Sequence, residues 1–387
     1  MNQAVPFIIG VVCITAICVH FLRREPKVLA LVYLWSTGMF IAALAFQPAP
    51  GETITMFLLD AALIIGIVFL AAGWLMYGKK IGHLLTIIGW QAFGIYWIME
   101  VPNYISLHPE DPTNVILYAP ALALFTVFSV HEYRAYKGEK ENRALKFMAG
   151  LTFVGAGVYF LFAKVPPFST GLIWATASQT SWLYNLVGGH TAVAGPTFDP
   201  ITNEVVVPIG GSSISIILAC TAIEAIVIFL GAFIAVEPRP EPWKGYKKLS
   251  PRIKRYMKMS SRERRVRALL YTIPPIWVLN LVRNVSILYL VDNDIVSFDL
   301  AHGYAGKAFS FIVLLALAMI VFDLVPEIYD DLLDLYRLGR PGKKGEEKGE
   351  SVGERARKKT MHEGKEVTAP GAGDEKKVPS ESESEEE

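Results

Sequence analysis

The sequence is poor in cysteine and has almost no net charge. Its 387 residues include three cysteines, and 37 Lys and Arg residues balance 36 Asp and Glu residues to a net charge of +1. Cys13, Cys18 and Cys220 form no CxxC pair, and no Cys/His cluster has zinc spacing. We therefore expect no disulfide framework, no metal and no cofactor, and the charge balance gives no reason to expect a nucleic-acid partner.

Long apolar runs dominate the sequence instead. Hydrophobic residues make up 52% of the chain, which predicts an all-α polytopic membrane protein with about nine transmembrane helices. The first run is followed by Arg23 and Arg24 and has no cleavage site, so we expect it to be a retained span. Stretches near the bilayer-crossing length of about 20 residues lie near 5–22, 28–46, 54–77, 81–99, 115–132, 147–165, 213–236, 267–291 and 305–325.

The basic residues occur in every second loop. Loops rich in Lys and Arg stay on the cytoplasmic side of a membrane, so we expect the intervening loops and the N-terminus to lie outside a plasma membrane that the chain crosses many times. The basic clusters are Arg23–Lys27, Lys79–Lys80, Arg134–Lys146, Lys244–Arg267 and the residues from Arg337 onward. The intervening loops are 47–53, 100–114, 166–212 and 292–304.

Three regions are expected along the chain. Residues 1–165 form a six-helix membrane region, and residues 166–338 combine an external loop with three helices. Residues 339–387 are rich in Lys and Glu and end in SESESEEE, a composition that cannot bury a core. We expect this tail to be disordered and cytoplasmic.

The external loop 166–212 contains two distinctive stretches. Leu172–Val187 carries Trp, Ser and Thr, which makes it too polar for a span and compatible with the membrane interface. Further on, the β-prone run Val205–Ile209 follows the turn-forming residues Pro200–Asn203. This order predicts a small hairpin or extended segment.

Three chemically active side chains are expected to meet near the outer face. At about 1.5 Å per residue, Cys220 lies roughly 10 Å deep in the seventh predicted span and Arg283 about 12 Å deep in the eighth. His302 stands just before the ninth span on the same side. A nearby cation favours the thiolate over the thiol, a guanidinium can hold an oxyanion, and an imidazole can transfer protons. The trio therefore indicates nucleophilic cysteine chemistry, with Cys220, Arg283 and His302 as catalytic residues.

These residues resemble the archaeosortase/exosortase family. The segment ACTAIE at Ala219–Glu224 is similar to the family's cysteine box, and Arg283 in LVRN and His302 in AHGYAGKAF stand where the family has its second and third catalytic positions. The resemblance covers roughly residues 170–325. Within the family the chain is most similar to the archaeosortase A type, whose substrates carry PGF-type signals, although His302 matches the exosortase form.

The resemblance implies a membrane cysteine transpeptidase whose active site faces the outside. Its partners would be secreted surface proteins with a C-terminal tripartite signal: a short motif, a hydrophobic helix and a basic end. The enzyme would cleave near the motif through a thioester on Cys220 and pass the new C-terminus to a membrane lipid. Glu224, Asn280 and Asn284 are candidates for substrate binding. The asparagines equally fit hydrogen bonds between helices, and Glu224 equally fits a structural pair with Arg283.

Two other classes of function remain open. Arg283 could bind an anion in a transporter or channel, or the protein could be a non-enzymatic scaffold that presents its charged tail. A metal site built from His190, Asp199 and His302 lacks recognisable ligand spacing.

Overall fold

The computed structural model describes residues 4–45, 53–107, 113–199, 205–212, 214–238 and 259–339. All of them belong to one compact unit, Met1–Gly339. Predictions for the turn at Pro200–Asn203, for most of the Lys244–Arg267 cluster and for the C-terminal tail lie outside the described residues.

The fold is that of an all-α polytopic membrane protein. Within the described ranges, eight helices are long and apolar enough to cross a membrane, and one further apolar helix is shorter. The eight candidate spans are Val5–Leu22, Pro26–Ala45, Phe57–Leu75, Lys80–Ile105, Val115–Tyr136, Arg143–Lys164, Ser261–Asp292 and Leu300–Leu324.

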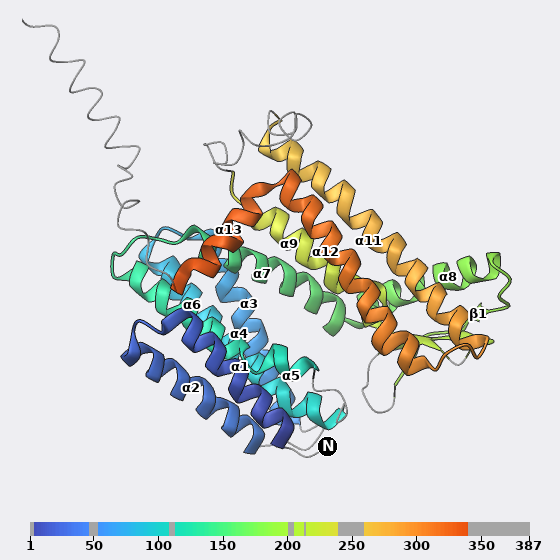
Figure 1. The fold of residues 1–387 in the computed structure, drawn as a ribbon, viewed down its shortest axis with the longest axis horizontal. Helices are drawn as coiled ribbons and strands as arrows, with labels where there is room; N and C mark the ends of the chain where they lie inside the picture. Colours follow the sequence, from blue (N-terminus) through green and yellow to red (C-terminus); the bar gives the residue numbers. More distant parts are fainter. Residues whose placement is uncertain are drawn as a thin grey trace, which may run out of the picture. The chain divides into compact units, whose positions relative to one another are not determined.

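Seven helices form the N-terminal half of the fold (Figure 1). They bury a large core that contains Phe40, Trp90 and Phe128. The helices are α1 (Ala4–Leu22), α2 (Pro26–Ala45), α3 (Thr53–Leu75), α4 (Lys80–Leu107), α5 (Thr113–Tyr118), α6 (Ala121–Tyr136) and α7 (Arg143–Lys164).

Helices α3 and α4 pack so closely that they need a small residue between them. A Cβ atom added at Gly73 would lie 2.8 Å from the backbone nitrogen of Thr86. Small residues at helix interfaces allow backbones to approach in membranes, where packing rather than the hydrophobic effect drives association.

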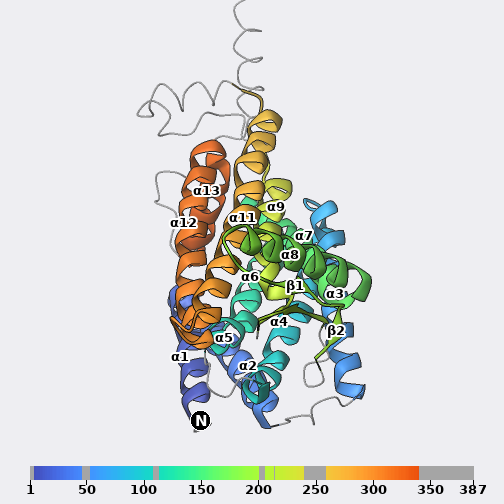
Figure 2. The same cartoon turned by 90° about the vertical axis from the view of Figure 1, so that its right-hand side faces the viewer.

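The C-terminal half surrounds a small sheet. Figures 1 and 2 show α11 and α12 side by side, with α8 next to the strands. Its elements are α8 (Pro166–Leu186), β1 (Ala192–Val193), β2 (Thr197–Phe198), β3 (Val205–Gly210), β4 (Ser215–Ile216), the 3-10 turn η1 (Leu218–Thr221), α9 (Ile223–Ala235), α11 (Ser261–Asp292), the π-helix η3 (Asp299–Gly306), α12 (Lys307–Leu324), α13 (Pro326–Tyr336) and η4 (Arg337–Gly339).

Strand β3 is the centre of the sheet and confirms the extended segment predicted at this place. It pairs antiparallel with β1, β2 and β4, with Val207 of β3 opposite Ile216 of β4. Val205, Val207 and Ile209 are buried, as the period of two along a strand requires. They share a core with residues of α8, α11 and η3.

Capping residues mark the beginnings of two long helices. The Asn142 side chain accepts a hydrogen bond from the backbone N–H of Ala144 at 2.8 Å, before α7. Ser260 accepts one from the backbone N–H of Glu263 at 3.2 Å, before α11. Such residues satisfy backbone donors that the first helical turn leaves without partners.

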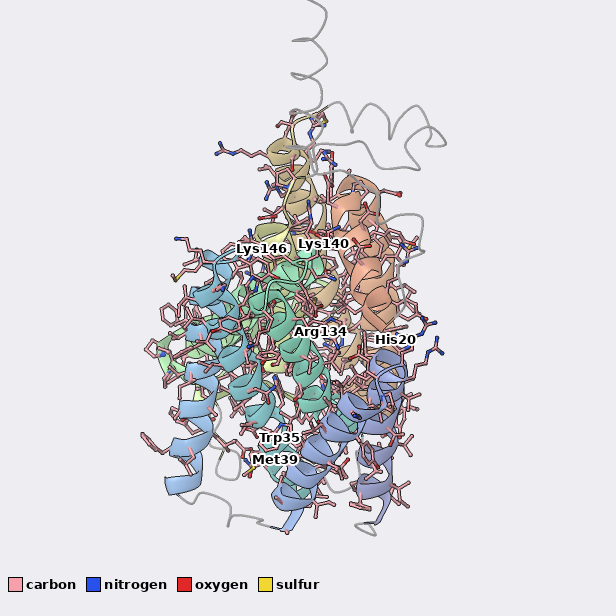
Figure 3. All side chains as sticks on the ribbon, turned by 90° about the vertical axis from the view of Figure 1, so that its left-hand side faces the viewer. His20, Trp35, Met39, Arg134, Lys140 and Lys146 are labelled. Atoms are coloured by element: carbon pink, nitrogen blue, oxygen red, sulfur yellow. The ribbon has the colours of Figure 1, made fainter. Side chains whose placement is uncertain are left out.

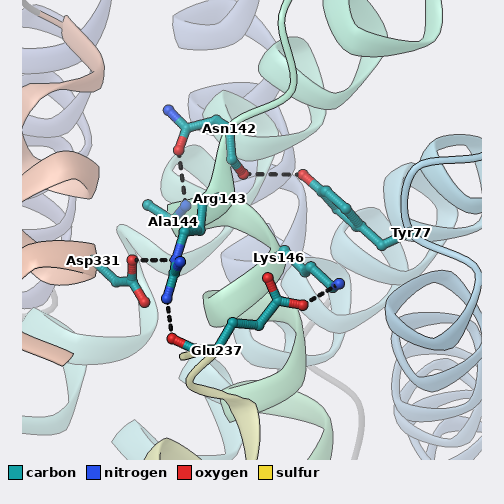
Figure 4. A network of polar contacts seen from close by, with 7 residues as sticks. All are labelled: Tyr77, Asn142, Arg143, Ala144, Lys146, Glu237 and Asp331. Carbon is teal, nitrogen blue, oxygen red and sulfur yellow. Dashed lines mark hydrogen bonds and ion pairs between the residues drawn. The ribbon is translucent and has the colours of Figure 1, made fainter. Parts of the chain in front are cut away.

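A polar network ties the end of α9 to α7 and α13 (Figure 4). The Arg143 Nε atom donates to Asp331 Oδ1 at 3.1 Å, and Lys146 forms an ion pair with Glu237, which follows α9. Lys140 and Lys146 lie toward the end of the helices opposite Trp35 and Met39 (Figure 3). The basic cluster that predicts a cytoplasmic face thus also fixes one end of α9.

The seventh expected span, 213–236, has a different structure from the one predicted. Only Ile223–Ala235 is an α-helix, with 13 residues, whereas Ser215–Ile216 is a strand and Leu218–Thr221 is a 3-10 turn. Residue 213 lies outside the described part of the chain. The segment is apolar, as the sequence indicates, but it forms a strand, a turn and a short helix in place of one span.

Candidate functional site

Cys220 lies in the short turn η1, between the sheet and α9, and not inside a membrane helix. Its side chain is buried, with 6% of the residue exposed. Ala222, two residues later, has a left-handed conformation with φ of 60°. This conformation is unfavourable for a residue with a Cβ atom, and it turns the chain between η1 and α9. The depth predicted for Cys220 from helical rise therefore rested on a wrong element.

Two asparagines of α11 hold the main chain of Cys220. The Nδ2 atoms of Asn280 and Asn284 donate to the Cys220 carbonyl oxygen at 2.7 and 2.9 Å. Both asparagines are buried. Because these two residues are one helical turn apart, their side chains lie on one face of α11 and can both donate to the same carbonyl oxygen. These two bonds bring the Cys220 turn next to the stretch of α11 that carries Arg283.

Arg283 lies between the Cys220 turn and the π-helix η3. Its Nη1 atom donates to Asn280 Oδ1 at 3.5 Å, near the limit of a hydrogen bond. A Cβ atom added at Gly306 of η3 would lie 3.0 Å from Arg283 Nε, so the guanidinium rests against this glycine. The Nε atom itself is buried and has no hydrogen-bond partner among the described residues.

His302 occupies the middle of η3, which begins the last span early. The π-helix Asp299–Gly306 leads directly into α12 at Lys307. The imidazole is half-buried and stacks on Phe298, with ring centroids 5.1 Å apart and planes inclined by 8°. The position predicted as a loop is thus helical, which carries the imidazole toward Arg283. Short π-helical segments often occur at functional sites.

Arg283 is the electrostatic centre of the site. Its charge interacts with the Cys220 thiol and the Glu224 carboxyl group, and it also interacts with the His302 imidazole. The contacts of the described residues include no hydrogen bond between Cys220 and His302. The trio is therefore organised around the guanidinium, with the thiol and the imidazole as its two neighbours.

The three candidate substrate-binding residues differ in their surroundings. Glu224 lies exposed in the first turn of α9, and no ion pair within the described residues joins it to Arg283. Asn280 and Asn284 both donate to the Cys220 carbonyl oxygen. They thus form hydrogen bonds between segments, which is close to the alternative role that the sequence left open for them. Their described contacts are those of residues that position the thiol-bearing turn.

Two residues that shape the site were missed by sequence reasoning. Ala222 provides the left-handed turn after Cys220, and Gly306 provides the space for Arg283. Neither residue type marks such a role in advance. One signal was present nearby: Ile214 and Ile216 alternate with serines, which is the period of a strand and not of a helix.

The candidate metal ligands of the predicted external loop form no metal site among the described residues. His190 is exposed just before β1. Among the described residues, no group of three or more His, Cys, Asp or Glu side chains is placed to hold a metal ion. Comparison of the chain with family models, with curated proteins and with solved structures finds no match.

Proposed function

We propose that this multi-pass membrane protein is a cysteine transpeptidase of the archaeosortase/exosortase kind. Cys220 is the nucleophile, Arg283 stabilises charge and His302 transfers protons. The observation that carries the proposal is the position of Arg283, whose side chain lies beside the Cys220 turn and against the helix that bears His302. The family-like motifs in the sequence support the same assignment.

The proposed reaction has two acyl-transfer steps. The Cys220 thiolate attacks the carbonyl carbon of a substrate peptide bond, and the tetrahedral oxyanion accepts hydrogen bonds from the guanidinium. Protonated His302 donates a proton to the leaving amine as the carbon–nitrogen bond breaks, which leaves a thioester. A nucleophile of the acceptor then attacks the thioester while His302 removes its proton, and the thiolate is released.

The donor at Arg283 Nε supports the charge-stabilising role. It is a buried N–H group with no hydrogen-bond partner among the described residues, and buried donors normally have one. An oxyanion formed at Cys220 would supply an acceptor at that moment of the reaction. Burial raises the pKa of the Cys220 thiol, and the neighbouring guanidinium acts against this rise and so favours the thiolate.

The length of α9 supports a site below the outer membrane surface. Its 13 residues span about 20 Å at the usual helical rise. The end of the helix near Glu237 lies on the predicted cytoplasmic side, so Cys220 lies about this distance from that side. A hydrocarbon core is about 30 Å thick, so Cys220 would lie about 10 Å inside the outer boundary, by these same dimensions. A substrate with a hydrophobic C-terminal helix would present its scissile bond near this depth.

The proposed substrates are secreted surface proteins whose C-terminus carries a PGF-type motif, an apolar helix and a basic end. The acceptor would be a membrane lipid. In this arrangement the site opens to the outside of the plasma membrane, and the charged tail lies in the cytoplasm.

Replacement of one cysteine tests the proposal. A reporter surface protein with such a C-terminal signal is co-expressed with the wild-type protein, with Cys220→Ala or with Cys13→Ala. We expect cleavage and lipid attachment to fall to background in Cys220→Ala, because the thioester cannot form, and to persist in Cys13→Ala, whose thiol lies in α1. Mass spectrometry of the reporter's C-terminus measures both events.

The same assay separates the proposal from its rivals. Full processing by Cys220→Ala, at wild-type protein levels, would overturn the transpeptidase assignment. Anion transport that persists in Cys220→Ala and depends on Arg283 would then identify a transporter.

A further inference from the structure

Helix α8 buries several hydroxyl groups and exposes large apolar side chains, together with the amides of Gln179 and Asn185. The buried face carries four hydroxyl groups: Ser169, Thr176, Thr180 and Ser181. The exposed face carries large apolar side chains, and Trp182 has 64% of its surface exposed. The other members of this face are Phe168, Trp174 and Leu186. We call these four residues the outer face of α8.

This distribution is the reverse of that expected for a helix in water. A surface helix of a water-soluble region directs its apolar stripe inward and its polar residues outward. The sequence of α8 contains no Asp, Glu, Lys or Arg over 21 residues, so the outer face has no charged neighbour on its own helix. An apolar surface of this kind marks contact with a membrane or with another protein.

The inner hydroxyl groups are largely satisfied by local hydrogen bonds. Ser169 donates to the carbonyl of Pro166 at 3.0 Å, and Thr176 donates to that of Leu172 at 2.9 Å. Ser181 bonds to the Thr191 hydroxyl at 2.9 Å. Hydroxyl groups bonded in this way can be buried at little cost. The fourth hydroxyl group, that of Thr180, is buried without a hydrogen-bond partner among the described residues.

Helix α8 is connected directly to two of the candidate spans. A single residue, Val165, separates α8 from α7, which is a candidate span. Trp277 of α11, another candidate span, donates from Nε1 to Gln179 Oε1 of α8 at 2.8 Å. In Figure 2, α8 runs across the view while α9 and α11 run upright. Tryptophan is enriched where membrane helices meet the polar boundary of the bilayer.

From these observations we infer that the outer face of α8 contacts membrane lipid at the end of the bundle where α7 ends. A helix in this position lies along the bilayer boundary with its apolar side among the acyl chains. The opposite side of the same helix packs against the site, because Ile173 and Ala177 share a core with Cys220. One helix therefore separates lipid from the turn that bears the thiol. The inference does not depend on the chemistry proposed above.

Tryptophan fluorescence in brominated lipid tests the inference. The full chain is reconstituted in phosphatidylcholine vesicles with plain or brominated acyl chains, as wild type and as a Trp174→Phe and Trp182→Phe double variant. Phenylalanine keeps the face apolar. The difference in emission between the wild type and the double variant is the emission of Trp174 and Trp182. We expect most of this difference to disappear in brominated lipid, because bromine quenches it. Trp90→Phe is the matched control, because Trp90 is fully buried and its emission should be equally bright in both lipids.

Two results would overturn the inference. If aqueous iodide, and not bromine, quenches the emission of Trp174 and Trp182, the outer face is in contact with water. If neither agent quenches it, protein covers this face, and a change of oligomeric state in the double variant would identify a second copy as the cover.

Discussion

At the scale of single residues, the site holds Cys220 through its main chain, and its thiol is buried beside these contacts. Asn280 and Asn284 both donate to the carbonyl oxygen, and the amide N–H of Cys220 bonds to the carbonyl of Ile217 at 2.9 Å. A buried carbonyl that loses its donors carries the full cost of desolvation. The two asparagines are therefore positioning residues for the thiol in the proposed reaction.

Replacing both asparagines should loosen the Cys220 turn. For Asn280→Ala with Asn284→Ala we expect a loss of about 1–3 kcal/mol in the free energy of unfolding, the cost of one unsatisfied buried carbonyl. Reversible unfolding in mixed detergent micelles measures it. The reaction of Cys220 with a maleimide, in a background without Cys13 and Cys18, should become faster because the turn opens more often.

Asn293→Ala is the control for that double variant. Asn293 is exposed and bonds to the Tyr289 carbonyl at the end of α11, so its loss should change stability by no more than about 0.5 kcal/mol. An unchanged maleimide rate in the double variant would show that other contacts hold the turn.

Residue types alone gave the identity of the candidate site but not its contacts. An arginine in a span needs a partner or a polar cavity, which is why the sequence indicates a functional site at Arg283. The sequence contains no signal that two asparagines would share one carbonyl, because that depends on where η1 meets α11. A contact between segments 60 residues apart, such as Asn280 with Cys220, is set by tertiary packing and not by local propensity.

At the scale of elements, the close approach of α9 to α7 determines where the Cys220 turn stands. A Cβ atom added at Gly231 of α9 would lie 2.8 Å from the backbone oxygen of Leu151 in α7. The other end of α9 is fixed through Glu237 and Lys146. These contacts hold the C-terminal half of α9, and the η1 end is held by Asn280 and Asn284 of α11.

Two glycine substitutions should change stability in opposite directions. Gly231→Ala should destabilise the protein by about 1–3 kcal/mol, because the helices must separate to admit the methyl group. Gly157→Ala in α7 should stabilise it by up to about 1 kcal/mol through helix propensity, because the nearest atom there, Ile67 Cγ2, would be 3.7 Å away. Thermal melting in detergent measures both variants. A Gly231→Ala protein as stable as Gly157→Ala would contradict the close packing of α7 and α9.

Hydropathy predicted the long helices well and the short elements poorly. The first predicted span, 5–22, coincides with α1 within a residue, because an uninterrupted apolar run has one stable form in lipid. The strand Ser215–Ile216 and the turn at Cys220 lie in a run that is just as apolar. An average over a window cannot distinguish a buried strand from a buried helix.

At the scale of the whole molecule, a buried ion pair joins the beginning of α11 to α13, across the intervening α12 in the chain. Arg264, in the first turn of α11, donates from Nη1 to Glu327 Oε2 of α13 at 3.1 Å, and a second bond joins the same two groups. Both residues are buried. Removing one partner of such a pair takes away the opposite charge that offsets the desolvation of the other.

Neutralising the buried carboxylate should weaken the whole C-terminal half. For Glu327→Gln we expect a loss of about 3–5 kcal/mol in the free energy of unfolding. Glu263→Gln removes an exposed pair with Arg267 within α11 and should cost about 0.3–0.5 kcal/mol. Unfolding by titration with a denaturing detergent measures both. Equal, small losses in the two variants would show that other contacts join α13 to α11.

The mutual arrangement of the helices was beyond prediction from the sequence. Amphipathic periodicity normally indicates which face of a helix is buried, but lipid and protein interior are equally apolar, so the long spans lack that signal. The contact of Arg283 with Gly306, for example, depends on the packing of α11 against η3. Composition predicted eight of the nine expected spans in their order along the described residues, but it did not predict which helices pack against one another.

The two asparagines and the arginine project from a single stretch of α11, which has a mechanical consequence. Membranes differ in thickness, and a helix of 32 residues responds by changing its tilt. Because Asn280 and Asn284 clamp the Cys220 carbonyl, the thiol-bearing turn is carried with α11 as it tilts. We therefore expect the separation between the Cys220 sulfur and the Arg283 guanidinium to change little with the thickness of the surrounding bilayer.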